Sequence, residues 1–255
     1  MGIRNPIERY GGKESDSYKY FANDFLSTRD AAWHSIWLQA MPAVLLPDVR
    51  SVLEFGGGRD LTRTIVRHFG IDYLSVDISN QFFPDVVSSI ADYRFTGQTY
   101  DLVCSFQCLE HNPLEDLDSL LRHMVQFTRK YFYVSVPYSG AWLSLAVSIR
   151  LPKFFWRRVF CSTSDTLGAR AIDTAPLQRR PPESRHAAHW WEAGRRNLPK
   201  RELMRRFERV GLRLVESKHN PLFPHHLFLL FERADSPRDG LPGEKASDPV
   251  RISSR

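Results

Sequence analysis

The segment Ser51-Val-Leu-Glu-Phe-Gly-Gly-Gly-Arg59, with Tyr73-Leu-Ser-Val-Asp77 downstream, constrains the fold more than any other part of the sequence. It predicts a buried strand, a glycine turn, a helix, and a second strand that ends on a carboxylate. A glycine turn that opens a helix presents backbone N–H groups to a ligand, and the carboxylate can accept hydrogen bonds from ribose hydroxyls. The sequence therefore predicts an α/β unit that holds an adenosine-containing cofactor.

Beyond this unit, strand and helix patterns alternate as in a doubly wound, mostly parallel sheet. The expected strands are 52–55, 73–76, 86–91, 100–106, 131–136, 212–216 and 227–231. The expected helices cover 18–41, 114–127 and 199–210, and a further helix follows the glycine turn and runs to residue 68. Pro42 and Pro47 close the first helix, and Asp60 or Thr62 could cap the second, which ends at Gly70. Because only a short connection joins the last two strands, we expect them to pair antiparallel.

Three segments lie outside this regular pattern. Residues 1–16 are polar and contain proline and glycine, so we expect a flexible arm before a domain over 17–233. Residues 139–185 carry several prolines and show no clear strand, which indicates an insertion that we extend over 139–198. Residues 234–255 are poor in apolar side chains and are expected to be disordered.

The net charge of +6 is unevenly distributed, because residues 139–213 hold 16 Lys and Arg against 6 Asp and Glu. A basic half can attract nucleic acid, anionic lipid or an acidic small substrate, and it can equally be a solvated surface. No apolar run approaches the roughly 20 residues that cross a bilayer. The N-terminal segment shows no signal-peptide pattern, so we expect a cytoplasmic protein.

Acidic residues recur where further strands end. Asp77 lies about 20 residues after the glycines, the distance at which a carboxylate reaches ribose hydroxyls. Asp92 follows the third expected strand, where it could meet an adenine edge. The segment Tyr100-Asp-Leu-Val-Cys-Ser-Phe-Gln-Cys-Leu-Glu-His-Asn-Pro113 predicts a fourth strand and then an acid–histidine pair at the switch point of the sheet. No third glycine follows the turn at the required position, which disfavours a nicotinamide dinucleotide.

With these features, the chain resembles the class I S-adenosylmethionine-dependent methyltransferases, particularly the ubiquinone-biosynthesis O-methyltransferases, over 51–137 and more loosely over 199–232. The resemblance implies a Rossmann-like sheet of strand order 3-2-1-4-5-7-6 with an antiparallel last strand, and S-adenosyl-L-methionine as the cofactor. The chain departs from the family pattern at Arg59-Asp60, where members of the family often carry a small residue. The cofactor-binding residues that the resemblance implies are Glu54, Gly56, Gly57, Gly58, Asp77, Ile78, Ala91, Asp92, Phe106 and Glu110.

Two histidines, His111 and His189, are candidate general bases if the methyl acceptor is a hydroxyl. His111 follows the fourth strand, although a hydrogen bond that fixes the loop is an equal alternative. Glu110 could contact the amino group of the cofactor or cap the next helix. We expect no metal site, and His225-His226 is expected to lie at a strand edge.

The inserted segment raises the question of specificity. Residues 142–158 mix aromatic and basic side chains, as interfacial helices do, and Pro152 would break such a helix in two. A lid over the active site is favoured over peripheral membrane contact through 142–160.

Three functions are consistent with the sequence. The first is O- or N-methylation of a small molecule or of a glycan or lipid precursor. The second is an RNA or protein methyltransferase that uses the basic half. Nucleic acid is disfavoured because the loop after the fourth strand lacks the Asn/Asp-Pro-Pro-Tyr/Phe stretch of many amino-methylating enzymes. The third is a binding protein that retains the fold without catalysis. The oligomeric state and the acceptor are left open.

Overall fold

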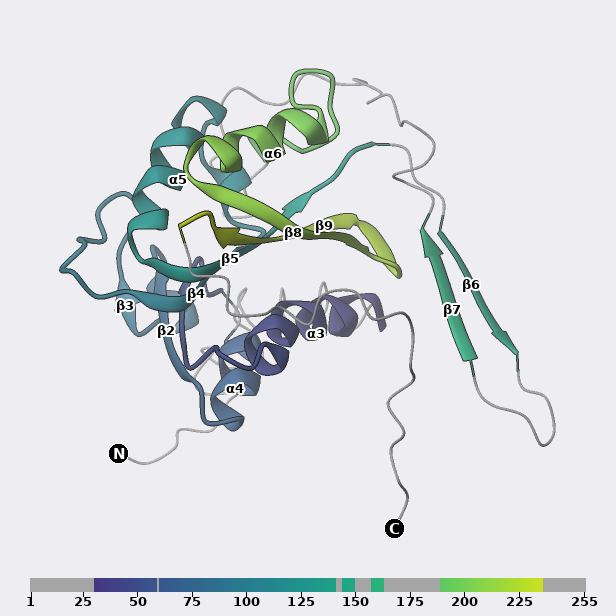
Figure 1. Cartoon of the computed structure of the whole chain (residues 1–255), viewed down its shortest axis with the longest axis horizontal. Helices are drawn as coiled ribbons and strands as arrows, with labels where there is room; N and C mark the ends of the chain where they lie inside the picture. The colour runs from purple at the N-terminus through teal and green to yellow at the C-terminus, as the bar shows by residue number, and fades with distance from the viewer. Residues whose placement is uncertain (1–29, 59, 141–143, 150–156, 163–188, 236–255) are drawn as a thin grey trace, which may run out of the picture.

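The computed structural model describes residues 30–58, 60–140, 144–149, 157–162 and 189–235. Its main element is a seven-stranded sheet of order β3-β2-β1-β4-β5-β9-β8 (Figure 1). The strands are β1 Ser51–Phe55, β2 Asp72–Asp77, β3 Val86–Val87, β4 Tyr100–Phe106, β5 Thr128–Pro137, β8 Leu212–Asn220 and β9 Phe223–Arg233. β1 to β5 pair in parallel, whereas β9 is antiparallel to both β5 and β8. The predicted strand order and the antiparallel finish are confirmed.

Four α-helices of the described ranges cover the two faces of the sheet: α3 Asp30–Leu45, α4 Leu61–His68, α5 Leu117–Gln126 and α6 Lys200–Arg209. Figure 1 shows α3 and α4 on one side of the sheet, and α5 and α6 on the other. Consecutive residues of β1 enter different cores, since Val52 packs on the α3 and α4 side and Leu53 on the α5 and α6 side. This alternation follows from the pleat of the strand, and it explains why apolar residues of β1 occupy consecutive positions.

The first helix continues past Pro42, where the sequence predicted its end. A proline inside a helix has no N–H, so the carbonyl oxygen of Leu38 loses its partner four residues on. The hydroxyl of Tyr133 in β5 donates to that oxygen at 2.9 Å, and both groups are buried. A side chain from the sheet thus replaces the missing backbone donor, and the helix runs to Leu45.

The third strand is shorter than predicted, because only Val86 and Val87 pair with β2. The chain then turns: the hydroxyl of Ser89 donates to Asp92 at 2.6 Å and accepts the Asp92 N–H at 3.1 Å. Such local side-chain bonds compete with the strand ladder. Ala91 and Asp92 therefore lie exposed in a turn rather than at a strand end.

Asp60 occupies the N-cap position of α4, one of the two positions predicted, but its side chain makes no capping hydrogen bond. The carboxylate of Asp60 is engaged by the Arg63 side chain, and the backbone of Asp60 is left-handed, with φ at 64°. The hydroxyl of Thr62 donates to Gln39 in α3 at 2.8 Å. Gly70 follows the helix with φ at 74°, as expected for a glycine that ends a helix.

The expectation of no clear strand within 139–185 is wrong. Strands β6 Ser144–Ile149 and β7 Arg157–Ser162 pair antiparallel as a second sheet, so residues 144–149 are not part of an interfacial helix. The alternation Ser-Leu-Ala-Val-Ser-Ile, with its branched residues, has the period of a strand. Pro152, the arm 1–16 and most of the tail 234–255 lie outside the described residues. Among the described helices, none is long and apolar enough to cross a membrane.

Candidate functional site

The glycine turn joins β1 to α4 in a conformation that larger residues adopt with difficulty. Gly56 has φ at 78°, and its N–H donates to the carbonyl of Val76 in β2 at 2.8 Å. A Cβ on Gly56 would lie 2.4 Å from the Sγ of Cys108, which follows β4. Because no side chain fits this contact, the turn lies directly against the segment after β4. The predicted tight turn is present, and this close approach together with the positive φ explains why the position requires glycine.

Asp77 ends β2 next to the turn, as predicted. One carboxylate oxygen accepts the N–H of Gly58 at 3.1 Å, and the other accepts the N–H of Ser79 at 2.8 Å. These bonds fix a half-buried carboxylate beside the turn at the carboxyl edge of the sheet. Ile78, the next residue, is 76% exposed there. A carboxylate held in this place can accept further hydrogen bonds from a ligand above the edge.

Glu54 lies beneath the turn. Its side chain is 3% exposed and accepts the hydroxyl hydrogen of Tyr73 at 2.9 Å. A Cβ on Gly57 would lie 3.2 Å from the same carboxylate, so the turn packs directly on Glu54. Burial raises the pKa of Glu54 to about 8, although the Tyr73 bond opposes this shift. Glu54 is therefore protonated at neutral pH.

Arg63 of α4 supports the same region, which the sequence did not reveal. Its guanidinium group is nearly buried and donates to Ser75 at 2.8 Å and to the carbonyl of Phe83 at 3.1 Å. It also forms ion pairs with Asp60 and Asp85. These bonds tie α4 to β2 and to the segment before β3.

Phe106, at the end of β4, is buried on the α3 and α4 side of the sheet, where its ring packs edge-on against Tyr133 at 5.4 Å. Its side chain therefore belongs to the core.

A surface pocket among the described residues is lined by Arg67, Asp72 and Tyr100. It lies at the opposite edge of the sheet, where β2 and β4 begin.

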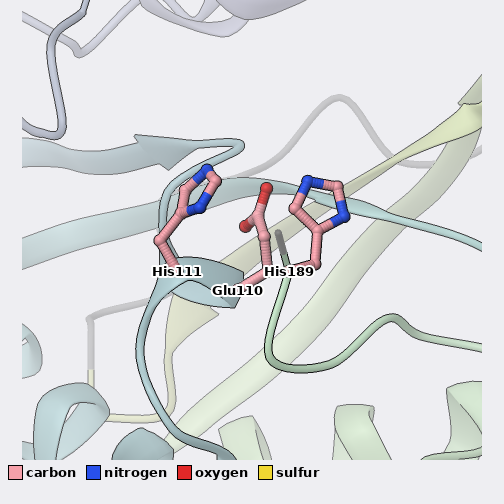
Figure 2. A group of neighbouring side chains, drawn as sticks. All are labelled: Glu110, His111 and His189. Atoms are coloured by element: carbon pink, nitrogen blue, oxygen red, sulfur yellow. The ribbon is translucent and has the colours of Figure 1, made fainter. Parts of the chain in front are cut away.

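Three polar side chains meet beyond the end of β4: Glu110, His111 and His189. Glu110 and His111 belong to the 3₁₀ turn η3 Leu109–His111, whereas His189 precedes α6 in the sequence. Figure 2 shows the carboxyl group of Glu110 between the two imidazole rings. The ring centroids of His111 and His189 are 5.4 Å apart. The structure thus brings both predicted bases together, although they lie 78 positions apart in the sequence.

Glu110 is fully buried, and neither of its carboxylate oxygens has a hydrogen-bond partner among the described residues. Burial raises its pKa to about 7, a shift that the charge of His189 opposes. A buried polar group without a partner costs about 1–3 kcal/mol, so such groups usually face a ligand or water. Glu110 does not cap the following helix, because neither oxygen accepts a backbone N–H from it.

The two histidines differ in their electrostatic surroundings. Although His111 reaches solvent, its pKa is lowered to about 4. The larger cause is partial burial of the ring, and the smaller cause is the charge of His189. Burial also opposes protonation of His189, but its hydrogen bond to Glu192, 3.0 Å from Nδ1, and the charge of Glu110 raise its pKa overall. His189 is therefore the stronger base of the pair.

The segment that carries His189 is fixed by backbone bonds to the carboxyl edge. The N–H of Trp190 donates to the carbonyl of Glu110 at 2.8 Å, and the indole N–H of Trp191 donates to that of Asn112 at 3.1 Å. Ala193 donates to Pro137 at the end of β5 at 2.9 Å. Trp191 is fully buried and is thus a core residue.

Two residues near His189 were not identified from the sequence, namely Glu192 and His225. The ring of His225 in β9 stacks on that of His189, with centroids 6.2 Å apart. Two sets have the spacing of metal ligands, with all donor atoms within 4.8 Å: Glu110 with His111 and His189, and His189 with Glu192 and His225. Imidazole and carboxylate suit Zn²⁺ and similar ions. Hydrogen bonding has the same spacing, and it accounts for the contact between His189 and Glu192.

The chain matches a family model described as a methyltransferase domain over residues 25–217. A comparison with curated proteins finds no match. Among solved structures, the 1,6-didemethyltoxoflavin-N1-methyltransferase of Burkholderia thailandensis is similar at 14% identity and a TM-score of 0.53, over 92% of this chain and 93% of that one. DesVI of Streptomyces venezuelae is similar at 15% identity and a TM-score of 0.52, over 86% of this chain and 98% of that one.

A third similar structure is an S-adenosylmethionine-dependent methyltransferase of Clostridium acetobutylicum, at 9% identity and a TM-score of 0.52, over 85% of this chain and 97% of that one. At these identities the likeness shows the fold. The likeness to ubiquinone-biosynthesis enzymes stays a prediction. Since the family model spans most of the chain, the protein belongs to the methyltransferase-domain family, with the fold and the cofactor, S-adenosylmethionine, of its class I members.

Proposed function

We propose that the protein transfers a methyl group from S-adenosylmethionine to a hydroxyl or amine of a small-molecule acceptor. One observation carries the proposal. Along a single edge of the sheet, the glycine turn and Asp77 adjoin a buried carboxyl group that has no partner among the described residues, and two imidazoles flank that carboxyl group. The first part suits a nucleoside, and the second suits a group that loses a proton.

The residues at the edge fit the cofactor. No side chain of the described residues covers the backbone at Gly58, where only the carbonyl oxygen of Gly56 lies within 4 Å of the position a Cβ would take, and this leaves room for a ligand to approach the turn. Asp77 would accept the ribose hydroxyls, and Ile78 would cover the nucleoside. Glu110 would accept hydrogen bonds from the amino group of the cofactor or from the acceptor. Asp92 stays a predicted adenine contact, now from an exposed turn.

S-adenosylmethionine supplies a methyl group that a nucleophile can attack in line. The protein must therefore align the acceptor, exclude water and accept a proton. In the proposal His189 accepts the proton, because its pKa is raised while that of His111 is lowered. His111, neutral at pH 7, would orient the acceptor by a hydrogen bond.

The class of acceptor is also a proposal. The Burkholderia relative is described with a bound small molecule, 1,6-didemethyltoxoflavin, together with S-adenosylhomocysteine. That description supports a small acceptor here but does not name it.

We propose in addition that residues 139–198 cover the acceptor as a lid and that the protein acts in the cytoplasm.

Isothermal titration tests the cofactor first. S-adenosylmethionine and S-adenosylhomocysteine should bind with a stoichiometry of one, whereas NAD and ATP should not. A panel of phenols, amino sugars and RNA with labelled methyl donor then tests the acceptor. Label in a small molecule supports the proposal. Label in RNA alone, or cofactor binding without transfer to any acceptor that the cell extract supplies, would reject it in favour of the two alternative functions.

A further inference from the structure

We propose that Glu192 is a positioning residue, which holds His189 as the base of the reaction through a carboxylate–imidazole pair. This inference rests on the proposed function, because it concerns the same proton transfer. Glu192 acts through His189 and does not itself contact the acceptor. The inference depends on how the two oxygens of Glu192 are shared, on the orientation of the imidazole, and on the charges around it.

The two oxygens of Glu192 have different roles. Oε2 accepts two hydrogen bonds from Arg195, from Nε at 3.1 Å and from Nη2 at 2.9 Å, and a third from the hydroxyl of Ser139. Oε1 faces Nδ1 of His189 at 3.0 Å. One oxygen therefore anchors the carboxylate and leaves the other for the imidazole. The pKa of Glu192 is lowered, most strongly by the hydrogen bond to His189 and less by those to Ser139 and Arg195, although burial opposes this shift. Glu192 therefore stays ionised.

This arrangement fixes the tautomer of His189. An ionised carboxylate only accepts hydrogen bonds, so Nδ1 must carry the hydrogen and Nε2 keeps its lone pair. Figure 2 shows one ring nitrogen of His189 directed toward Glu110 and the other on the far side of the ring. Because Nδ1 is engaged by Glu192, Nε2 is the nitrogen directed toward Glu110 and the candidate acceptor site.

The proton and electron balance is complete. The acceptor oxygen or nitrogen bonds to the methyl carbon as the carbon–sulfur bond breaks, and the bonding pair stays on sulfur as a neutral thioether. The acceptor proton passes to Nε2 of His189. The resulting imidazolium lies beside the Glu192 carboxylate, which stabilises its charge.

Within the described part of the chain, five titratable or charged groups surround His189, and they come from three segments. They are Glu110 and His111 of η3, Glu192 and Arg195 of the loop that precedes α6, and His225 of β9. Glu192 and Glu110 favour the imidazolium, whereas burial and Arg195 oppose it. Without the charge of Glu192, burial and Arg195 still lower the pKa of His189, and only the charge of Glu110 raises it.

The decisive variant is Glu192→Gln, which keeps the shape and removes the charge. Glu202→Gln is the matched control, because Glu202 pairs with Arg205 and Arg209 on the outer surface of α6. Nitrogen-15 NMR of the imidazoles, with His189→Ala to assign the signal, follows protonation with S-adenosylhomocysteine bound. We expect Glu192→Gln to lower the pKa of His189 and to increase the population of the other tautomer, whereas Glu202→Gln changes neither.

Kinetics give the second readout. The kcat of Glu192→Gln should fall about tenfold or more, with the acidic limb of its pH profile moved to lower pH and the affinity for S-adenosylhomocysteine unchanged. In the His189→Ala background, Glu192→Gln should cause no further loss. Ser139→Ala, which loosens the anchor but keeps the charge, should lower kcat a few-fold, and it replaces Glu192→Gln if that variant does not fold.

Several results would overturn the pair. An unchanged His189 pKa and kcat in Glu192→Gln would do so, as would full additivity with His189→Ala. So would stoichiometric Zn²⁺ binding on which activity depends, because His189 would then be a metal ligand. If no acceptor is methylated, the proposed function fails but the NMR comparison still decides whether Glu192 sets the tautomer.

Discussion

Replacing Glu54 with glutamine should stabilise the protein at alkaline pH, contrary to the usual cost of removing a buried charge partner. Glu54 is buried beneath the glycine turn, and its pKa rises from 4.5 to about 8 because burial disfavours the carboxylate. Above pH 4.5 the unfolded chain therefore loses this proton while the folded chain keeps it. The contribution of Glu54 is fully favourable below pH 4.5 and is lost as pH rises toward 8.

The size of the effect follows from the shift in pKa. Each pH unit between the two values costs about 1.4 kcal/mol, so the full interval corresponds to roughly 5 kcal/mol. The amide of Glu54→Gln has nearly the same shape, and its oxygen can still accept the Tyr73 hydroxyl. The substitution should therefore remove most of the pH dependence and leave the packing under Gly57 intact.

Urea unfolding followed by circular dichroism at pH 5, 6.5 and 8 measures the difference. The free energy of unfolding of Glu54→Gln relative to the wild type should increase steadily across this range, by a few kcal/mol at pH 8. Glu202→Gln, on the surface of α6, should show no such trend. A difference that does not change with pH would show that Glu54 is not held protonated, and the account of the turn would be wrong.

Three further predictions concern the site. Gly56→Ala should abolish detectable binding of S-adenosylmethionine in titration calorimetry, because its Cβ would lie 2.4 Å from a cysteine sulfur; Gly70→Ala, with a similar φ of 74° but no atom within 4 Å, should bind normally. Asp77→Asn should weaken binding about tenfold or more, the cost of a charged hydrogen bond, and equal affinity would exclude a ribose contact. His189→Ala should lower kcat about a hundredfold and His111→Ala less, with unchanged binding of S-adenosylhomocysteine; full rates in both variants would rule out a base at either position.

Several features of the fold could be predicted because they depend on neighbours in the sequence. The glycine turn and the runs of apolar residues in β4 and β9 report backbone conformation directly. The end of the first helix could not be predicted in this way. Pro42 is a local signal to stop, but the donor that satisfies Leu38 comes from Tyr133, 95 residues away.

The third strand and the hairpin show two further limits. Val86 to Ala91 has an apolar beginning that suits a strand, but the local bonds of Ser89 and Asp92 end it after two residues. In the segment 139–198, prolines outweighed the alternation of 144–149, which forms β6. In both cases two local signals compete, and the sequence does not say which is stronger.

The sequence by itself determined the alternation of strands and helices, the glycine turn with Asp77 beside it, and the place where Glu110 and His111 follow β4. The order of the strands in the sheet was predicted from the resemblance to the class I methyltransferases. Only the tertiary structure decided that His189, Glu192 and His225 meet there, since they come from the loop before α6 and from β9. The physical reason is that a turn or a strand end is encoded by adjacent residues. The approach of distant loops is decided by how β5 and β9 pair and by the backbone bonds that fix Trp190 and Ala193 to the edge.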